Sequence, residues 1–174
     1  MNYFDFYEIP LRFNPNQEVI KQKFYAFSKK FHPDFYANES SEKQEEVLEL
    51  STLNNKAYQV LKDAEKRLHY LLVQKGQLAE GENYALPQDF LMEMMEVNEQ
   101  VMDLQFDPDP AKLAKLKSEI LELENALQAK LNNLTAIYDQ QAERGEEGTL
   151  VEIKDLYFRN KYLLRIKEGI LKIR

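Results

Sequence analysis

Hydrophobic residues recur along most of this chain at the three- and four-residue spacings of amphipathic helices. In the first half, the pattern predicts a helix with Asn14 as its cap and Pro15 in its first turn. Pro33 would end this helix, because proline disfavours helical backbone in the residue before it. The apolar stripe of this helix consists of Ile20, Phe24, Phe27 and Phe31.

Two more helices are predicted in the first half, over about residues 40–61 and 64–73. If the two long helices pack antiparallel, the turn at His32-Pro33-Asp34 lies at one tip. An aromatic-rich segment, residues 3–9, precedes them. The side chains expected to point inward are Val47, Leu50, Asn54, Ala57, Leu61, Leu68, Leu71 and Leu72.

The second half predicts three helices, over about residues 87–106, 110–142 and 149–172. The middle one follows an alternation of aspartate and proline, which is typical of a helix start, and ends near Ala142. Because the connections are short, we expect an antiparallel three-helix bundle. The heptad seam of the middle helix consists of Leu113, Leu116, Ile120, Leu123, Leu127, Leu134 and Ile137.

Charge divides the chain at the same place as a glycine-containing segment. Residues 1–75 hold 11 basic and 11 acidic residues, whereas residues 76–174 hold 12 basic and 19 acidic ones. Gly76 stands where a helix C-cap is expected, and Gly81 follows it closely. We therefore predict an all-α protein with a domain at 1–75, a linker at 76–86 and a second domain at 87–174.

Composition excludes several classes of function. The chain has no Cys and two His, which argues against disulfides, thiolate metal sites and a Cys nucleophile, and fits a reducing compartment. A net charge of −7 argues against nucleic acid as the main partner. No apolar run reaches the ~20 residues that span a bilayer, and no secretory signal is visible. We expect a cytoplasmic protein, neither membrane-bound nor an enzyme, without metal or nucleotide cofactor.

The helix at 87–106 carries more apolar surface than one core face requires. Phe90, Met94, Val97, Val101 and Leu104 fall in one narrow sector of it. A second group, which grades from apolar to acidic, lies to one side: Leu91, Met92, Met95, Met102, Glu96, Glu99 and Asp103. The helix has five acidic residues and no basic one. A methionine-rich patch with an acidic rim suits a protein-binding surface, and the alternative is a wide core face in a bundle.

The last helix adds one aromatic residue to this surface. Phe158 lies roughly opposite the buried sector and is expected to be exposed. That sector is predicted to contain Ile153, Leu156, Leu163, Leu164, Ile170 and Leu171. Single exposed apolar residues are common, but an aromatic beside a methionine patch is typical of a binding hot spot.

The tripeptide His32-Pro33-Asp34, together with its flanking segments, resembles a J domain, the module that stimulates ATP hydrolysis by DnaK-type chaperones. The aromatic segment 3–10 and the segment 54–61 share this resemblance. It implies that the tripeptide is essential for stimulation and that the positive helix before it docks on an acidic chaperone surface. The lysines concerned are Lys21, Lys23, Lys29 and Lys30; the alternative is an ordinary solvated face. Phe35 departs from the Lys or Arg that many J domains carry there.

The whole pattern resembles the HscB family, co-chaperones of iron–sulfur cluster assembly, with a local match at residues 90–99. The resemblance implies binding of an IscU-type scaffold and presentation of that scaffold to an HscA-type ATPase. Met95 replaces a more usual Leu, and Asp103 stands where Glu is common. The implied contacts are Leu91, Met92, Met95 and Phe158 for apolar packing, and Glu96, Glu99 and Asp103 for charge.

Three rival hypotheses remain at this point. The C-terminal bundle of a J-domain protein could hold another client, or only dimerise. The tripeptide could be a coincidence in a structural adaptor, and an enzyme is the weakest alternative because no nucleophile–base pair is visible. The oligomeric state stays open between a monomer and a weak dimer.

Overall fold

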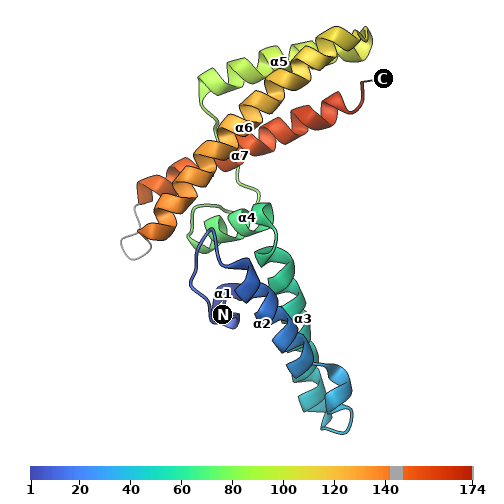
Figure 1. Cartoon of the computed structure of the whole chain (residues 1–174), viewed down its shortest axis with the longest axis vertical. Coiled ribbons are helices and arrows are strands. Elements are labelled where there is room, and N and C mark those ends of the chain that lie inside the picture. Colours follow the sequence, from blue (N-terminus) through green and yellow to red (C-terminus); the bar gives the residue numbers. More distant parts are fainter. Residues whose placement is uncertain (142–146, 174) are drawn as a thin grey trace. The chain divides into compact units, whose positions relative to one another are not determined.

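The computed structural model describes residues 1–141 and 147–173, which are helical with connecting turns and contain no strands (Figure 1). This confirms the predicted all-α fold class. The chain divides into two compact units, residues 1–76 and residues from 77 onward. The elements are α1 (Tyr3–Phe6), α2 (Gln17–Lys30), the 3₁₀ helix η1 (Pro33–Tyr36), α3 (Ser41–Leu61), α4 (Ala64–Gln74), α5 (Gln88–Phe106), α6 (Pro110–Gln140) and α7 (Glu147–Ile170).

The N-terminal cap of α2 is Asn16, so the prediction of Asn14 is wrong. The Asn16 side chain accepts hydrogen bonds from the backbone amides of Glu18 and Val19, at 3.0 and 3.3 Å. A cap must reach amides two or three residues ahead, and Asn14 is too early in the chain to do so for a helix that begins at Gln17. Pro15 therefore lies before the cap rather than in the first turn.

A buried asparagine joins three elements of the first unit, in which α2 and α3 lie side by side (Figure 1). Asn54 of α3 donates to the carbonyl oxygen of Phe24 and to the hydroxyl of Ser28, both at 3.1 Å. Its side-chain oxygen accepts from the hydroxyl of Tyr7, which follows α1, at 2.8 Å. Because a buried amide needs partners for both of its ends, these bonds determine how the three elements meet.

Arg67 of α4 holds a second buried polar position in this unit. Its Nε donates to the carbonyl oxygen of Phe13 at 2.8 Å, and its Nη1 to that of Leu61 at 2.7 Å. The guanidinium thus connects the loop before α2 with the last turn of α3. A fork of fixed donors suits this role, because two acceptors in one plane can be satisfied together.

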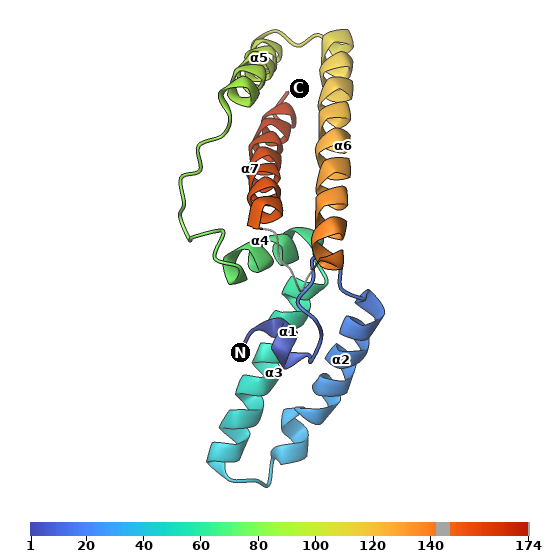
Figure 2. The same cartoon turned by 90° about the vertical axis from the view of Figure 1, so that its left-hand side faces the viewer.

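In the second unit, α5, α6 and α7 lie side by side in both views, which confirms the predicted three-helix arrangement (Figures 1 and 2). The seam of α6 matches the prediction only in part: Leu116, Ile120 and Leu127 are buried, but Leu113 and Leu123 are half-buried. Leu134 and Ile137 are only half-buried, because the buried face continues through Leu131, Thr135 and Tyr138. A straight helix repeats every 3.6 residues, so a strict heptad pattern drifts off the core over a helix of this length.

The buried face of α7 also differs in part from the prediction. Ile153, Leu156, Leu163 and Ile170 are buried as expected, but Leu164 and Leu171 are exposed, and Ile166 and Tyr157 take their places. Leu164 lies 11 residues after Ile153, which is itself a helical spacing, so periodicity alone does not separate Leu164 from the buried residues. The end of α6 predicted near Ala142 lies outside the described residues; α6 ends at Gln140.

Candidate functional site

The His32-Pro33-Asp34 tripeptide forms the turn between α2 and α3 and is exposed throughout. His32 caps η1, because its Nδ1 accepts from the backbone amide of Asp34 at 3.3 Å. The carboxylate of Asp34 approaches the same Nδ1 to 3.7 Å. The side chains of all three residues are therefore accessible to a partner, while the imidazole is held by its own turn.

Neighbouring side chains fix the backbone around this turn. The Tyr36 hydroxyl donates to the carbonyl oxygen of Lys30, the last residue of α2, at 2.8 Å. From α3, the Gln44 amide donates to the carbonyl oxygens of Ala37 and Glu39, at 3.1 and 2.9 Å. The turn is tied to both helices, and such preorganisation lowers the entropy lost when a partner binds.

The four predicted lysines of α2 do not lie in equivalent surroundings. Lys21 and Lys29 are exposed. Lys23 forms an ion pair with Glu8, with 2.8 Å between Nζ and Oε2, and this hydrogen bond lowers the pKa of Glu8. The Lys30 ammonium lies 5.2 Å from the centre of the Phe31 ring, which is cation–π range. The basic surface of α2 is thus carried mainly by Lys21, Lys29 and Lys30, of which Lys29 and Lys30 lie at the end of the helix next to the tripeptide.

Phe35 is an exposed aromatic residue within the candidate site. Its side chain is 68% exposed, and its ring centre lies 5.7 Å from that of His32. Composition and periodicity do not single it out, because its exposure depends on the 3₁₀ turn that follows the tripeptide. A partner that contacts His32 would also meet this ring.

The outward face of α5 agrees with the helical-wheel prediction. Met92 and Met95 are 61% and 60% exposed, and Leu91 is half-buried. The three predicted carboxylates, those of Glu96, Glu99 and Asp103, are exposed as well. The opposite face of α5 is buried at Phe90, Met94, Val101 and Leu104, with Val97 half-buried. Together, these residues leave an apolar and acidic surface on α5 that the core of the unit does not use.

The sequence predicted that Phe158 is exposed, but the structure shows it half-buried. The Tyr84 ring stacks on it, with 4.6 Å between ring centres, and Tyr157 meets it edge-on. Tyr84 belongs to the segment expected to be a linker, and its hydroxyl donates to Asp155 of α7 at 2.8 Å. Burial, together with this bond to Asp155, raises the pKa of Tyr84 to about 12.

The segment that includes Tyr84 is therefore packed on α7. Glu82 adds an ion pair with Lys154 of α7. The sequence offered one signal for this packing, an aromatic residue within a stretch that otherwise resembles a linker. One face of Phe158 is covered by Tyr84, so a partner can reach only part of its ring.

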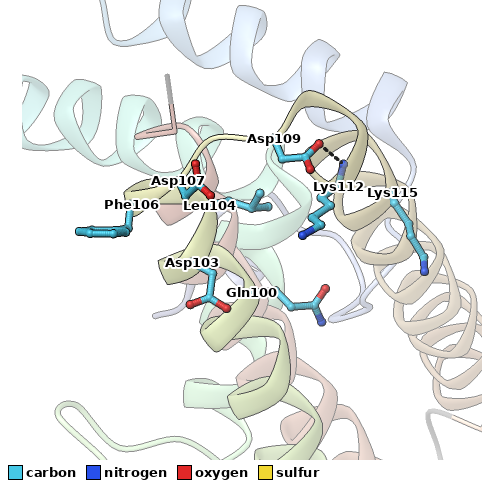
Figure 3. Close-up of a pocket in the computed structure, with 8 residues that line it drawn as sticks. All are labelled: Gln100, Asp103, Leu104, Phe106, Asp107, Asp109, Lys112 and Lys115. Atoms are coloured by element: carbon cyan, nitrogen blue, oxygen red, sulfur yellow. Dashed lines mark hydrogen bonds between the residues drawn. The ribbon is translucent and has the colours of Figure 1, made fainter.

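Two grooves lie between α5 and α6. The larger one, about 590 Å³, is at the turn between the two helices and is lined by Gln100, Asp103, Leu104, Phe106, Asp107, Asp109, Lys112 and Lys115 (Figure 3). The smaller one, about 270 Å³, is lined by Glu93, Glu96, Val97, Gln100, Glu119, Ile120 and Leu123. Carboxylates line both grooves, and the larger groove is also lined by Lys112 and Lys115 of α6.

Within residues 1–141 and 147–173, no three His, Cys, Asp or Glu side chains converge as a metal site. The described helices are also too short or too polar to cross a membrane. What the geometry presents are two surfaces for protein partners, one at the turn after α2 and one on α5. An exposed His-Pro-Asp turn on a helical hairpin defines the class of J-domain proteins, and in this chain a three-helix unit follows it.

Comparisons with known proteins agree with this class. Residues 2–70 match the DnaJ domain, and residues 86–171 match the HSCB C-terminal oligomerisation domain. The co-chaperone protein HscB homolog of Vibrio atlanticus is 30% identical, with 98% of this chain and 95% of that protein covered. Co-chaperone protein HscB of Buchnera aphidicola is 33% identical over 75% and 72% of the two chains. The chain belongs to the HscB family of co-chaperones, which is not a family of enzymes.

Solved structures show the same fold. Chaperone HscB from Vibrio cholerae superposes with a TM-score of 0.67 and 26% identity, over 99% of this chain and 97% of that one. The crystal structure of human co-chaperone protein HscB gives a TM-score of 0.68 at 24% identity, over 98% and 81%. These comparisons support the predicted family and fold class. They do not test the individual site residues.

Proposed function

We propose that this protein binds an IscU-type iron–sulfur scaffold through α5 and stimulates an HscA- or DnaK-type ATPase through the His32-Pro33-Asp34 turn. One observation carries the proposal: a single chain of the HscB family holds a tied, exposed His-Pro-Asp turn in one unit and an unused apolar, acidic helix face in the other. Delivery of the scaffold to the ATPase would then promote maturation and transfer of the cluster.

On the chaperone side, charge brings the partners together and the turn makes the specific contact. Lys29 and Lys30 are exposed at the end of α2 next to the turn, and Lys21 is exposed farther back on the same helix. An acidic partner surface would be attracted and oriented by them. Asp34 and His32 are held by each other and by the 3₁₀ turn, so they can meet the partner without rearrangement. Phe35 would be covered on docking, which adds apolar contact where many J domains have a cation.

On the scaffold side, the contact combines apolar burial with acidic recognition. Met92 and Met95 stand free of the core, and methionine adapts its shape to a partner. Burying one such side chain fully is worth about 1.5–3 kcal/mol. The exposed carboxylates beside them, Glu96, Glu99 and Asp103, select a scaffold surface that carries Lys or Arg. Phe158 contributes the part of its ring that Tyr84 leaves uncovered.

Single-turnover ATP hydrolysis by an HscA-type chaperone tests the proposal. The protein is added alone and then with an IscU-type scaffold. We expect stimulation by the protein alone, synergy when the scaffold is present, and a fall to the basal rate for His32→Gln. His69→Gln is the matched control, because His69 is the other histidine and lies exposed on α4, outside the turn.

Each outcome separates two hypotheses. Stimulation without synergy would keep the chaperone contact and exclude the scaffold as client, which favours a bundle that holds another protein. No stimulation of an active chaperone, or equal loss in His32→Gln and His69→Gln, would contradict the role of the turn. Full activity of His32→Gln would point to an adaptor in which the tripeptide is a coincidence.

A further inference from the structure

Two exposed apolar side chains of α5 are not among the proposed scaffold contacts, which run from Leu91 to Asp103. Met102 lies between two of those contacts, and Phe106 lies beyond the last one. Met102 is 64% exposed, and Phe106, the last residue of α5, is 94% exposed. A single exposed apolar residue is ordinary, but a row of them on one face is typical of an interaction surface. The position of these two residues on the helix therefore needs an explanation.

Both residues fall on the same face as the proposed scaffold contacts. From Met92 through Met95, Glu99 and Met102 to Phe106, the spacings are three, four, three and four residues. At about 100° per residue, all eight positions from Leu91 to Phe106 that are assigned to this face lie in a sector of about 140°. Met102 and Phe106 lie within that sector, not at its edge. We call this row of Met92, Met95, Met102 and Phe106 the methionine–phenylalanine stripe.

The surroundings of the stripe at its C-terminal end are acidic and grooved. Figure 3 shows the Phe106 ring projecting from the end of α5, next to Asp103 and Asp107. The groove of about 590 Å³ begins at this point and separates α5 from Lys112 and Lys115 of α6. The apolar stripe and its carboxylates thus run together along the whole of α5, which has no basic residue of its own.

We propose that Met102 and Phe106 extend the scaffold-binding surface over the full outward face of α5, so that the scaffold contacts the stripe as far as the turn into α6. This proposal rests on the proposed function. From Leu91 to Phe106 the surface measures about 22 Å at 1.5 Å per residue, compared with about 18 Å if it ends at Asp103. The complementary element of the scaffold is a surface on which apolar side chains alternate with Lys or Arg.

Two arguments favour the scaffold over a second copy of this chain as the occupant. The stripe is continuous with the face of α5 that carries the proposed scaffold contacts, without an intervening buried turn. Two copies of α5 would also bring the three carboxylates of this face, Glu96, Glu99 and Asp103, from each helix into one interface, without a balancing cation on either helix. Charge repulsion opposes that arrangement, whereas a basic scaffold surface would relieve it.

Calorimetric titration of the full-length protein with purified apo scaffold tests the extension. The variants are Met102→Ala with Phe106→Ala, Met92→Ala with Met95→Ala, and Leu121→Ala as the control. Leu121 is 56% exposed on α6 and outside the stripe. We expect both double variants to weaken the affinity about tenfold, as for two moderate hot-spot residues, and the control to leave it unchanged. Met102→Ala with Phe106→Leu should bind more tightly than Met102→Ala with Phe106→Ala, because leucine keeps an apolar side chain at position 106.

The outcomes distinguish failure of this extension from failure of the proposed function. If only Met92→Ala with Met95→Ala weakens binding, the interface ends before Met102 and the extension is wrong. If neither double variant weakens it, the scaffold does not bind α5 and the proposed function itself is wrong. Equal weakening by Leu121→Ala would mean a general effect of surface apolarity and would also overturn the extension. Far-UV circular dichroism of each variant verifies that the helices are retained. Substitution of Phe106 should not disturb the fold, because its side chain is nearly fully exposed.

Discussion

At the scale of single residues, buried polar side chains decide how the J-domain unit is assembled. Asn54 satisfies both ends of its amide, with Phe24 and Ser28 on one side and Tyr7 on the other. The Tyr7 hydroxyl also donates to the backbone carbonyl oxygen of Asn54 at 3.2 Å, and burial raises the pKa of Tyr7 above its ordinary value. The sequence indicated that Asn54 points inward, but its three partners come from elements far away in the chain.

Removal of the Tyr7 hydroxyl should destabilise the first unit. Tyr7→Phe keeps the ring and leaves the Asn54 side-chain oxygen buried without its donor, a loss of about 1–3 kcal/mol in the free energy of unfolding. This loss is measured by urea unfolding of the full chain, monitored by circular dichroism. Tyr25→Phe is the control, since Tyr25 is an exposed tyrosine of α2. Equal midpoints for the two variants would show that the buried bond contributes nothing.

At the scale of elements, the helices begin where a side chain can cap them. The side chains of Ser40, Asp63 and Asp109 accept hydrogen bonds from backbone amides at the starts of α3, α4 and α6. α5 differs, because Pro87 stands at its cap position and makes no such bond. Its C-terminal end carries Phe106 into solvent at the turn to α6. The helix with the proposed binding surface is thus held by its buried face rather than by its cap.

The cap of α6 gives a prediction at this scale. Asp109 Oδ1 accepts from the amides of Ala111 and Lys112, at 3.0 and 3.2 Å. Asp109→Ala should therefore lower the free energy of unfolding by about 1 kcal/mol, since two helix amides lose their acceptor. Asp107→Ala is the matched control: Asp107 is an exposed aspartate two residues earlier and outside the cap. Thermal unfolding of both variants measures the two effects. A larger effect of Asp107→Ala would contradict the assignment of Asp109 as the cap of α6.

At the scale of the whole molecule, the two proposed surfaces belong to different units, each with its own buried core. The first unit contains the His32 turn, and the second contains α5. Their charges differ too, because the acidic excess of the chain lies in residues 76–174. A division of this kind allows one partner to be bound by each unit.

The two activities should therefore be separable in the full-length protein. His32→Gln is expected to keep the affinity for scaffold and to lose stimulation of the ATPase. Met92→Ala with Met95→Ala is expected to do the reverse: basal stimulation remains and the synergy with scaffold disappears. Calorimetry and single-turnover hydrolysis, performed on the same preparations, measure both quantities. Loss of scaffold affinity in His32→Gln would mean that the two surfaces act as one site.

The candidate site was predictable wherever one helix supplies all of its members. The spacing of Met92, Met95, Glu96 and Glu99 separates them from Phe90 and Met94, because a helix assigns faces by residue number alone. The tripeptide was likewise visible as a helix stop. Phe158 was misjudged, since its exposure depends on Tyr84, 74 positions earlier in the chain.

The sequence by itself did not determine the short helices α1 and η1, but it determined the longer helices, their order, the family and the outward face of α5. These follow from local periodicity, capping residues and short motifs, which act over a few residues. Only the tertiary structure decided the partners of Asn54 and Arg67, the neutralisation of Lys23 by Glu8, and the cover that Tyr84 places on Phe158. Contacts of that kind depend on which segments the packed core brings together, and local spacing carries no information about them.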